Sequence, residues 1–128
     1  MDHITLVVVD LEATRKFYVD IIGMGEVERP DFGFPGLWFQ LGDTQIHLNV
    51  AGERAGKPGL PDMGASSPSQ GFHFAFSVAD AEKAAAQFTD LGFEIIDGPR
   101  PRPDGAVQFY VRDPDGHLVE ICDAPRPS

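Results

Sequence analysis

The fold is decided by two stretches of sequence that resemble each other, HITLVVVD at residues 3–10 and HFAFSVAD at residues 73–80. In each stretch a histidine opens an apolar, strand-like run, and an aspartate follows it seven positions later. The side chains of Asp10 and Asp80 can accept hydrogen bonds from the free N–H groups of a helix's first turn, so each predicts a helix start. Apolar residues then recur at helical spacing until Gly23 and Gly92, which we expect to end the two helices. The chain therefore contains a strand followed by a helix twice, in register.

After each helix the sequence predicts one short strand and then a hairpin of two strands. These strands are expected at residues 25–29, 37–41 and 44–50 in the first half and at residues 94–97, 107–112 and 117–122 in the second. The hairpins are indicated by turn residues between apolar runs, Gly42 and Asp43 in the first copy and residues 113–116 in the second.

The sequence therefore predicts an α+β fold made of two βαβββ modules. The modules cover about residues 1–50 and 71–123, and the Gly- and Pro-rich stretch 51–70 is interpreted as a linker or as a loop over a site. We expect the two sheets to form a cupped, partly open barrel around a central site, all within one domain of residues 1–128.

Composition limits the classes of function. The chain has 128 residues, 42% of them hydrophobic, and a formal net charge of -10, which fits one globular domain and disfavours binding to a phosphate backbone. The longest apolar run near the start, residues 6–9, is too short for a membrane span. No charged segment followed by an apolar one precedes it, so no signal peptide is expected. The single cysteine, Cys122, forms no intrachain disulfide, so a cytoplasmic protein without nucleic-acid or membrane partners is expected.

Alternation along the strands separates a fully apolar face, which should pack against the helices, from a mixed face. The mixed faces carry no lysine and only one glutamate, which is unusual for a solvent-exposed surface. We therefore expect these faces to line the cup, with the following side chains: His3, Trp38, Gln40, Gln45, His47, Asn49, His73, Ser77, Gln108, Tyr110, Arg112 and Glu120.

Four of these residues predict a metal site. His3 and His73 begin the first strand of each module, and His47 and Glu120 lie in the last strands. Imidazole nitrogens and carboxylate oxygens are ligands for divalent metals such as Zn, Ni, Mn and Fe, and a two-fold relation between the modules would bring the four side chains together. Each histidine alone is more simply explained as a polar residue near a strand end, but their equivalent placement in the repeat favours metal binding.

Other candidate residues have two interpretations each. Tyr110 and Arg112 could hold an oxyanion or carboxylate of a substrate, whereas Arg112 could equally pair with an acidic neighbour. Trp38, with Phe32 and Phe34 upstream, could form an apolar wall for an aromatic or acyl substrate or could be core. The favoured interpretations are an exposed turn residue for His117, a small buried residue for Cys122, and a solvated loop for the Arg100 and Arg102 segment.

The sequence resembles the vicinal oxygen chelate superfamily, which includes glyoxalase I, methylmalonyl-CoA epimerase, extradiol dioxygenases and bleomycin-resistance proteins. The resemblance rests on Asp2-His3-Ile4 with Asp10-Leu11-Glu12, on residues 72–76 (FHFAF), and on residues 109–117 (FYVRDPDGH) leading to Val119-Glu120-Ile121. It covers nearly the whole chain and is weakest over residues 51–70.

This resemblance places His3, His73 and Glu120 on the family's ligand positions. Position 47, the fourth ligand of the lyase and epimerase branches, is usually Glu or Gln there and is His47 here. The resemblance implies a metal-dependent lyase or isomerase that acts on a small oxygen-rich substrate, with Glu120, His47 and Tyr110 as catalytic candidates. Candidate substrate-binding residues are Trp38, Gln40, Gln45, Asn49, Gln108 and Arg112.

Two other functions remain open for such a chain. One is an Fe(II) extradiol-type dioxygenase that uses His3, His73 and Glu120 as its metal triad. The other is a ligand-sequestering protein of the bleomycin-resistance type, although such proteins generally lack the metal ligands. Members of the superfamily commonly form homodimers, and some build each site from two chains, so we expect a homodimer.

Overall fold

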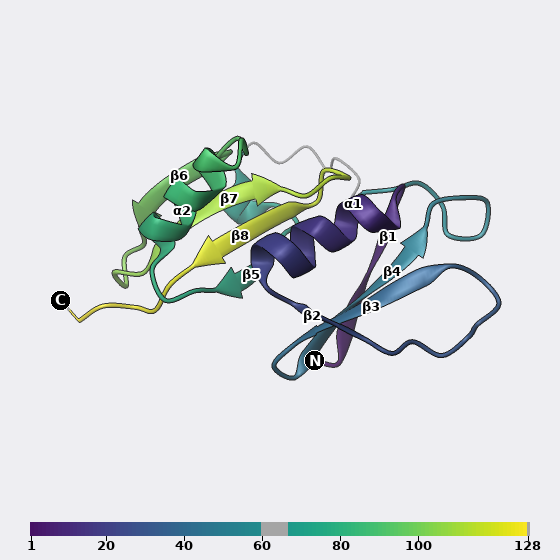
Figure 1. The fold of residues 1–128 in the computed structure, drawn as a ribbon. Coiled ribbons are helices and arrows are strands. Elements are labelled where there is room, and N and C mark those ends of the chain that lie inside the picture. The colour runs from purple at the N-terminus through teal and green to yellow at the C-terminus, as the bar shows by residue number, and fades with distance from the viewer. Residues whose placement is uncertain (60–66, 128) are drawn as a thin grey trace. The chain divides into compact units, whose positions relative to one another are not determined.

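The computed structural model describes residues 1–59 and 67–127, and the chain divides into two compact units, Met1–Gly59 and Leu60–Ser128. Each unit contains one four-stranded sheet with a helix, so the fold is α+β and consists of two βαβββ modules (Figure 1). Neither sheet closes on itself among the described strands, because each has two unpaired edges.

The N-terminal unit has the strand order β1-β4-β3-β2, with β1 parallel to β4 and the other pairs antiparallel. Its elements in chain order are β1 (His3–Val8), α1 (Leu11–Arg15), a π-helical continuation (Lys16–Ile22), β2 (Gly25–Val27), β3 (Gly36–Leu41) and β4 (Thr44–Val50). These bounds confirm the predicted strand–helix–hairpin order of the first module.

The C-terminal unit repeats this arrangement with the strand order β5-β8-β7-β6, and β5 is parallel to β8. Its elements are a short 3-10 turn (Pro68–Gln70), β5 (Phe74–Ser77), α2 (Ala81–Asp90), β6 (Asp97–Pro101), β7 (Val107–Arg112) and β8 (Leu118–Cys122). The strand near residues 94–97 was predicted too early, because β6 begins at Asp97 and continues through a bulge to Pro101. Within the stretch expected to be a linker, residues 60–66 lie outside the described residues.

The helix signals of the sequence are confirmed. The carboxylate of Asp10 accepts from the N–H groups of Glu12 and Ala13, and that of Asp80 accepts from the N–H of Lys83. Gly23, with φ of 100°, ends the first helical segment in the left-handed conformation that favours glycine.

Each helix packs on its own sheet through aromatic rings. Tyr18 lies 6.4 Å from Phe39 on β3, and Phe88 lies 5.7 Å from Phe109 on β7, measured between ring centroids. Phe39 and Phe109 are fully buried, as the alternation of the strands predicted. These pairs form the core of each unit and leave the opposite strand faces to the polar side chains.

His117 was expected to be an exposed turn residue, and this expectation is wrong. The side chains of His117 and Asp113 are 1% and 0% exposed, and His117 Nδ1 lies 2.7 Å from Asp113 Oδ2. Asp113 Oδ1 also accepts from the backbone N–H groups of Asp115 and His117. The carboxylate therefore organises the turn before β8 from the inside, and the imidazole completes this buried network.

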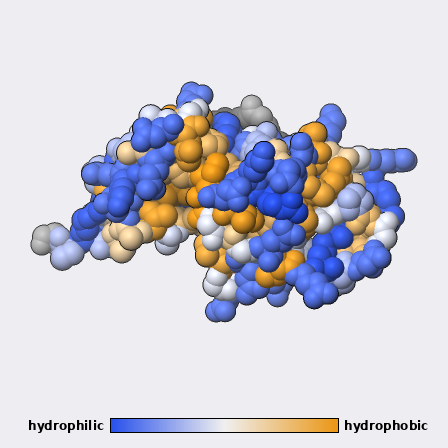
Figure 2. Space-filling model, in the orientation of Figure 1, coloured by the Kyte–Doolittle hydropathy of each residue, from blue (hydrophilic) through white to orange (hydrophobic). Residues whose placement is uncertain are grey.

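The surface combines hydrophilic side chains with exposed apolar ones, visible in Figure 2 as blue and orange atoms. The apolar ones include Phe32, Phe34 and Phe72, each at least 45% exposed. Among the described helices, none has the length and apolar character that crossing a bilayer requires.

Candidate metal centre

In the C-terminal unit, His73, directly before β5, lies beside Glu120 in the middle of β8. His73 Nε2 is 3.2 Å from Glu120 Oε1, and the two side chains are 21% and 9% exposed. Two ligand atoms on one ion, each about 2.1 Å from it, are separated by roughly 3.0–3.4 Å in octahedral or tetrahedral geometry. The observed separation therefore suits two ligands of a single metal ion.

The protonation of His73 supports the same conclusion. His73 Nδ1 lies 2.9 Å from the carbonyl oxygen of Gly71, which can only accept, so Nδ1 carries a proton. Nε2 is therefore the ring nitrogen that faces the carboxylate oxygen of Glu120, and either a proton or a metal ion between the two atoms makes this contact favourable. A ligating histidine that donates its other nitrogen to a carbonyl is also the usual arrangement around protein-bound metals.

Two further side chains position the carboxylate of Glu120. The hydroxyl of Tyr110, on β7, donates to Glu120 Oε1 over 2.8 Å, and Arg102 Nη1 lies 4.0 Å from Oε2. Burial, and then the hydrogen bond to Glu120, raise the pKa of Tyr110, so the phenol keeps its proton and remains a donor. Tyr110 was expected on this face, whereas Arg102 was expected in a solvated loop, because its Pro-rich segment has no periodic pattern.

In the N-terminal unit, His3 and His47 form the corresponding pair. Their rings stack at 3.8 Å between centroids, and His47 stacks in turn on Trp38 at 4.0 Å. His3 Nδ1 lies 2.7 Å from the carboxylate of Asp2, so His3 Nε2 is the atom available to an ion. Asp2 was named only as part of the Asp2-His3-Ile4 motif, and no role beside His3 was predicted for it.

Strand register shows that the two pairs are equivalent. In the parallel pairs, His47 on β4 lies opposite Thr5, and Glu120 on β8 lies opposite Ala75. Thr5 and Ala75 each follow the opening histidine by two positions, so His47 and Glu120 occupy the same place in the two units. The structure therefore assigns the sequence-predicted ligands to two pairs, one in each unit. Within the described residues no group of three or more His, Cys, Asp or Glu side chains gathers.

A relay of two side-chain amides determines the tautomer of His47. Gln40 Nε2 donates to the carbonyl oxygen of Gly42, Gln45 Nε2 donates to Gln40 Oε1, and Gln45 Oε1 then faces His47 Nε2 at 2.7 Å. Because the relay ends on a backbone carbonyl, both amide orientations are fixed, and His47 Nε2 must carry the proton. His47 Nδ1 is therefore its lone-pair atom. Burial and the neighbouring His3 lower the pKa of His47, which favours the neutral ring.

Breaking this relay is expected to change the tautomer of His47. In metal-free protein at pH 8, ¹⁵N spectra should show His47 almost entirely as the Nε2–H form, and Gln45→Met should populate both tautomers because the fixed acceptor is lost. Gln108→Met is the matched control, since Gln108 lies in the other unit. An unchanged His47 spectrum in Gln45→Met would contradict the relay.

The other predicted substrate-binding residues differ in their surroundings. Trp38 stacks on His47, Gln40 and Gln45 belong to the relay, and Asn49 lies two residues beyond His47 on the same face of β4. Gln108 is buried in β7, whereas Arg112 is exposed and donates to the carbonyl oxygen of Gly116. Arg112 thus holds the turn before β8, and its partner is a carbonyl rather than the acidic neighbour that was considered. Cys122 is half-buried, with its thiol near the carbonyl oxygen of Phe76.

Comparisons with known proteins show the family of the chain. The family description Glyoxalase/Bleomycin resistance protein/Dioxygenase superfamily matches residues 1–121. The glyoxalase domain-containing protein RDO1 of Mycosarcoma maydis is 32% identical over 126 residues, which are 94% of this chain and 66% of RDO1. A protein of Synechocystis sp. that carries the name lactoylglutathione lyase is 30% identical, covering 93% of this chain and 91% of that protein.

A solved structure shows the same fold. The crystal structure of a glyoxalase family protein from Bacillus anthracis has a TM-score of 0.70 and 29% identity, with 96% of this chain and 93% of that chain covered. Because the family match spans nearly the whole chain and both βαβββ modules, the chain belongs to the Glyoxalase/Bleomycin resistance protein/Dioxygenase superfamily.

Proposed function

We propose that this protein is a divalent-metal-dependent enzyme of the lyase or isomerase type that acts on a small, oxygen-rich substrate. His3, His73 and Glu120 are its metal ligands, and His47 is the fourth residue of the centre. The observation that supports this proposal most strongly is the 3.2 Å contact between His73 Nε2 and Glu120 Oε1, a separation that suits two ligands of one ion. The name of the Synechocystis relative, lactoylglutathione lyase, supports the lyase or isomerase class of reaction.

When bound, a divalent metal would act as a Lewis acid that polarises adjacent oxygens of the substrate. The chain's own residues would hold the substrate and move its proton. His47 presents Nδ1 as a lone pair in a neutral ring and can accept a proton there, while Glu120 is the second candidate. Tyr110 and Arg102 orient the Glu120 carboxylate and limit its motion.

His47→Ala is expected to separate metal binding from proton transfer. The other three ligands should retain the ion, whereas turnover should fall by about 100-fold or more, because general acid–base groups contribute about that much. The metal content by elemental analysis and the turnover number are measured on the same sample. Unchanged turnover would show that His47 takes no part in the reaction. Loss of the metal would show that His47 is an essential ligand.

Tyr110→Phe is expected to weaken metal binding by about 10-fold while the fold is kept, since residues that position a ligand have effects of about 10- to 100-fold. The measurement is competitive titration of the metal-free protein against a chelator. Affinity equal to that of the unmodified protein would show that the Tyr110 hydrogen bond is only structural.

The activity itself is tested with metal-reconstituted protein. The substrates are hemithioacetals formed from 2-oxoaldehydes and thiols, with catechols and oxygen as the comparison. We expect metal-dependent isomerisation of a hemithioacetal and none in Glu120→Gln. Cleavage of a catechol by the Fe(II)-loaded protein would instead establish a dioxygenase. Binding of hemithioacetals or catechols without turnover would contradict the proposal that the protein is an enzyme.

The same proposal takes the protein to be a homodimer, with each centre built from one chain or from two. Sedimentation equilibrium distinguishes a mass of twice 13.9 kDa from the monomer. Mixing His3→Ala with Glu120→Ala chains then shows whether a centre combines residues of two copies, because only shared centres regain metal binding.

A further inference from the structure

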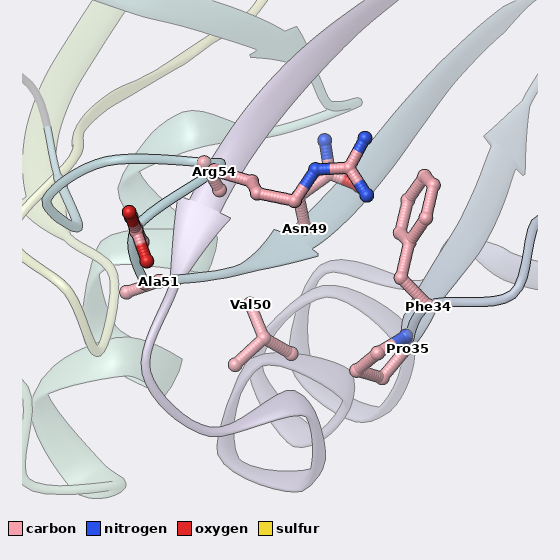
Figure 3. Close-up of a pocket in the computed structure, with 9 residues that line it drawn as sticks. Phe34, Pro35, Asn49, Val50, Ala51 and Arg54 are labelled. Atoms are coloured by element: carbon pink, nitrogen blue, oxygen red, sulfur yellow. The ribbon is translucent and has the colours of Figure 1, made fainter.

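The N-terminal unit contains a pocket that none of the predicted metal ligands lines. It has a volume of about 460 Å³ and lies where β4 ends and the following loop begins (Figure 3). Phe34, Pro35, Val50 and Ala51 give it apolar walls, and Asn49, Glu53 and Arg54 are its polar lining residues. Figure 3 shows the guanidinium group of Arg54 extending over β4 toward the ring of Phe34. The pocket is therefore mostly apolar, with its polar groups concentrated along one strand and loop.

A row of aromatic rings connects this pocket with the histidine pair of the same unit. Phe34 lies 5.8 Å from Phe32, and Phe32 lies 6.1 Å from Trp38, between ring centroids. Trp38 then stacks on His47, whose other face stacks on His3. Phe32 and Phe34 are 51% and 45% exposed, so these rings are open to a ligand rather than buried as core. The row can support a flat or apolar group along its length.

The charges around the pocket favour an anion. Arg54 is exposed and makes no hydrogen bond or ion pair with any residue that the structure describes, unlike the other six arginines. Arg29 lies 5.1 Å from the centre of the Phe34 ring and donates to the Phe34 carbonyl oxygen, and none of the described carboxylates forms an ion pair with it. Among the residues that line the pocket, Arg54 is the one cation and Glu53 the one carboxylate, and Arg29 beside Phe34 adds a second positive charge next to the pocket. The planar, forked donors of the two arginines match a carboxylate.

We propose that this pocket binds the carboxylate end of the substrate, and that the substrate's aromatic or apolar body lies along the rings from Phe34 to Trp38. Arg54 is the principal partner of the carboxylate, and the amide of Asn49 offers a second donor. Glu53 disfavours a doubly charged group such as phosphate, so a single carboxylate fits best. This assignment rests on the proposed function, because it places the reacting oxygens beside His47 and the carboxylate at the opposite end of the row.

Trp38 is the only tryptophan of the chain, so its fluorescence reports ligand binding along the row of aromatic rings. The experiment titrates metal-free protein with 3-phenylpropionate and follows Trp38 fluorescence, with 3-phenylpropionamide and butyrate as comparison ligands. We expect saturable binding of 3-phenylpropionate. The neutral amide should bind about 10-fold more weakly or worse, because a charge-assisted hydrogen bond is lost, and butyrate should bind more weakly because it lacks the ring.

Arg54→Gln should weaken binding of 3-phenylpropionate by about 10-fold without affecting the amide. Lys57→Gln is the matched control, since it removes one exposed positive charge from the same loop and should have little effect. Equal binding of acid and amide, equal effects of the two substitutions, or no fluorescence change with any ligand would each overturn the proposal. The protein carries no metal in this experiment, so a failure of the pocket is distinguishable from a failure of the metal centre, which elemental analysis measures separately.

Discussion

Replacing Glu120 by Gln is expected to abolish turnover and to lower the affinity for a divalent metal by more than about 100-fold. The substitution preserves the shape of the side chain but removes the negative charge that faces His73 Nε2. Residues that only position a metal ligand already change affinity by about 10- to 100-fold, so loss of a charged ligand should exceed that range. Isothermal titration of metal-free protein with Zn²⁺ or Ni²⁺ measures the effect.

Glu94→Gln is the matched control for this experiment. Glu94 belongs to the same unit and loses the same charge, but it is exposed and distant in sequence from the histidine contact. Its metal affinity should stay within about two-fold of the original, since exposed charges contribute little. Equal affinity losses in the two variants, or no loss in Glu120→Gln, would rule out Glu120 as a ligand.

Asp113→Ala is expected to be the most destabilising exchange of a single polar residue, with a loss of about 3 kcal/mol in the free energy of unfolding. Asp113 accepts from two backbone N–H groups and contacts His117 Nδ1 at 2.7 Å, all inside the unit. Alanine leaves these buried donors without an acceptor, and breaking a buried pair in this way costs about 3–5 kcal/mol. Urea denaturation monitored by circular dichroism gives the value.

The comparison variant for stability is Glu94→Ala, an exchange of an exposed carboxylate that should change stability by less than about 0.5 kcal/mol. Asp113→Asn should fall between the two, because an amide oxygen can still accept one of the backbone bonds. A loss below about 1 kcal/mol in Asp113→Ala would show that the buried pair adds little to the fold.

The arrangement of strands and helices could be predicted because its signals are local and occur twice. Asp10 and Asp80 cap their helices through their own side chains, and the alternation in residues 107–112 places Phe109 on the face that packs against α2. The start of β6 was misplaced because its register shifts between Asp97 and Arg100, and a bulge has no periodic pattern. The exposure of His117 was predicted wrongly because a turn residue is ordinarily exposed. Its burial against Asp113 follows from the folded turn and has no pattern in the sequence.

The sequence predicts a set of candidate ligands but not the hydrogen-bond network around them. The repeat identified His3, His47, His73 and Glu120 as equivalent positions, which strand register confirms. Their protonation depends on partners with no signal in the sequence, such as the carbonyl oxygen of Gly71. Gln40 and Gln45 were predicted to bind substrate, but in the structure their amides bond to each other, which depends on side-chain conformation rather than on residue type.

The most direct test of the metal centre is elemental analysis of protein purified without a tag or chelator, followed by titration of the metal-free protein with Ni²⁺, Zn²⁺, Mn²⁺ and, without oxygen, Fe²⁺. We predict that about one ion binds per chain in the unmodified protein, and that His3→Ala and Glu120→Ala each lose this binding. Specific binding that persists in both variants, or no specific binding of any of the four metals, would contradict the proposed centre.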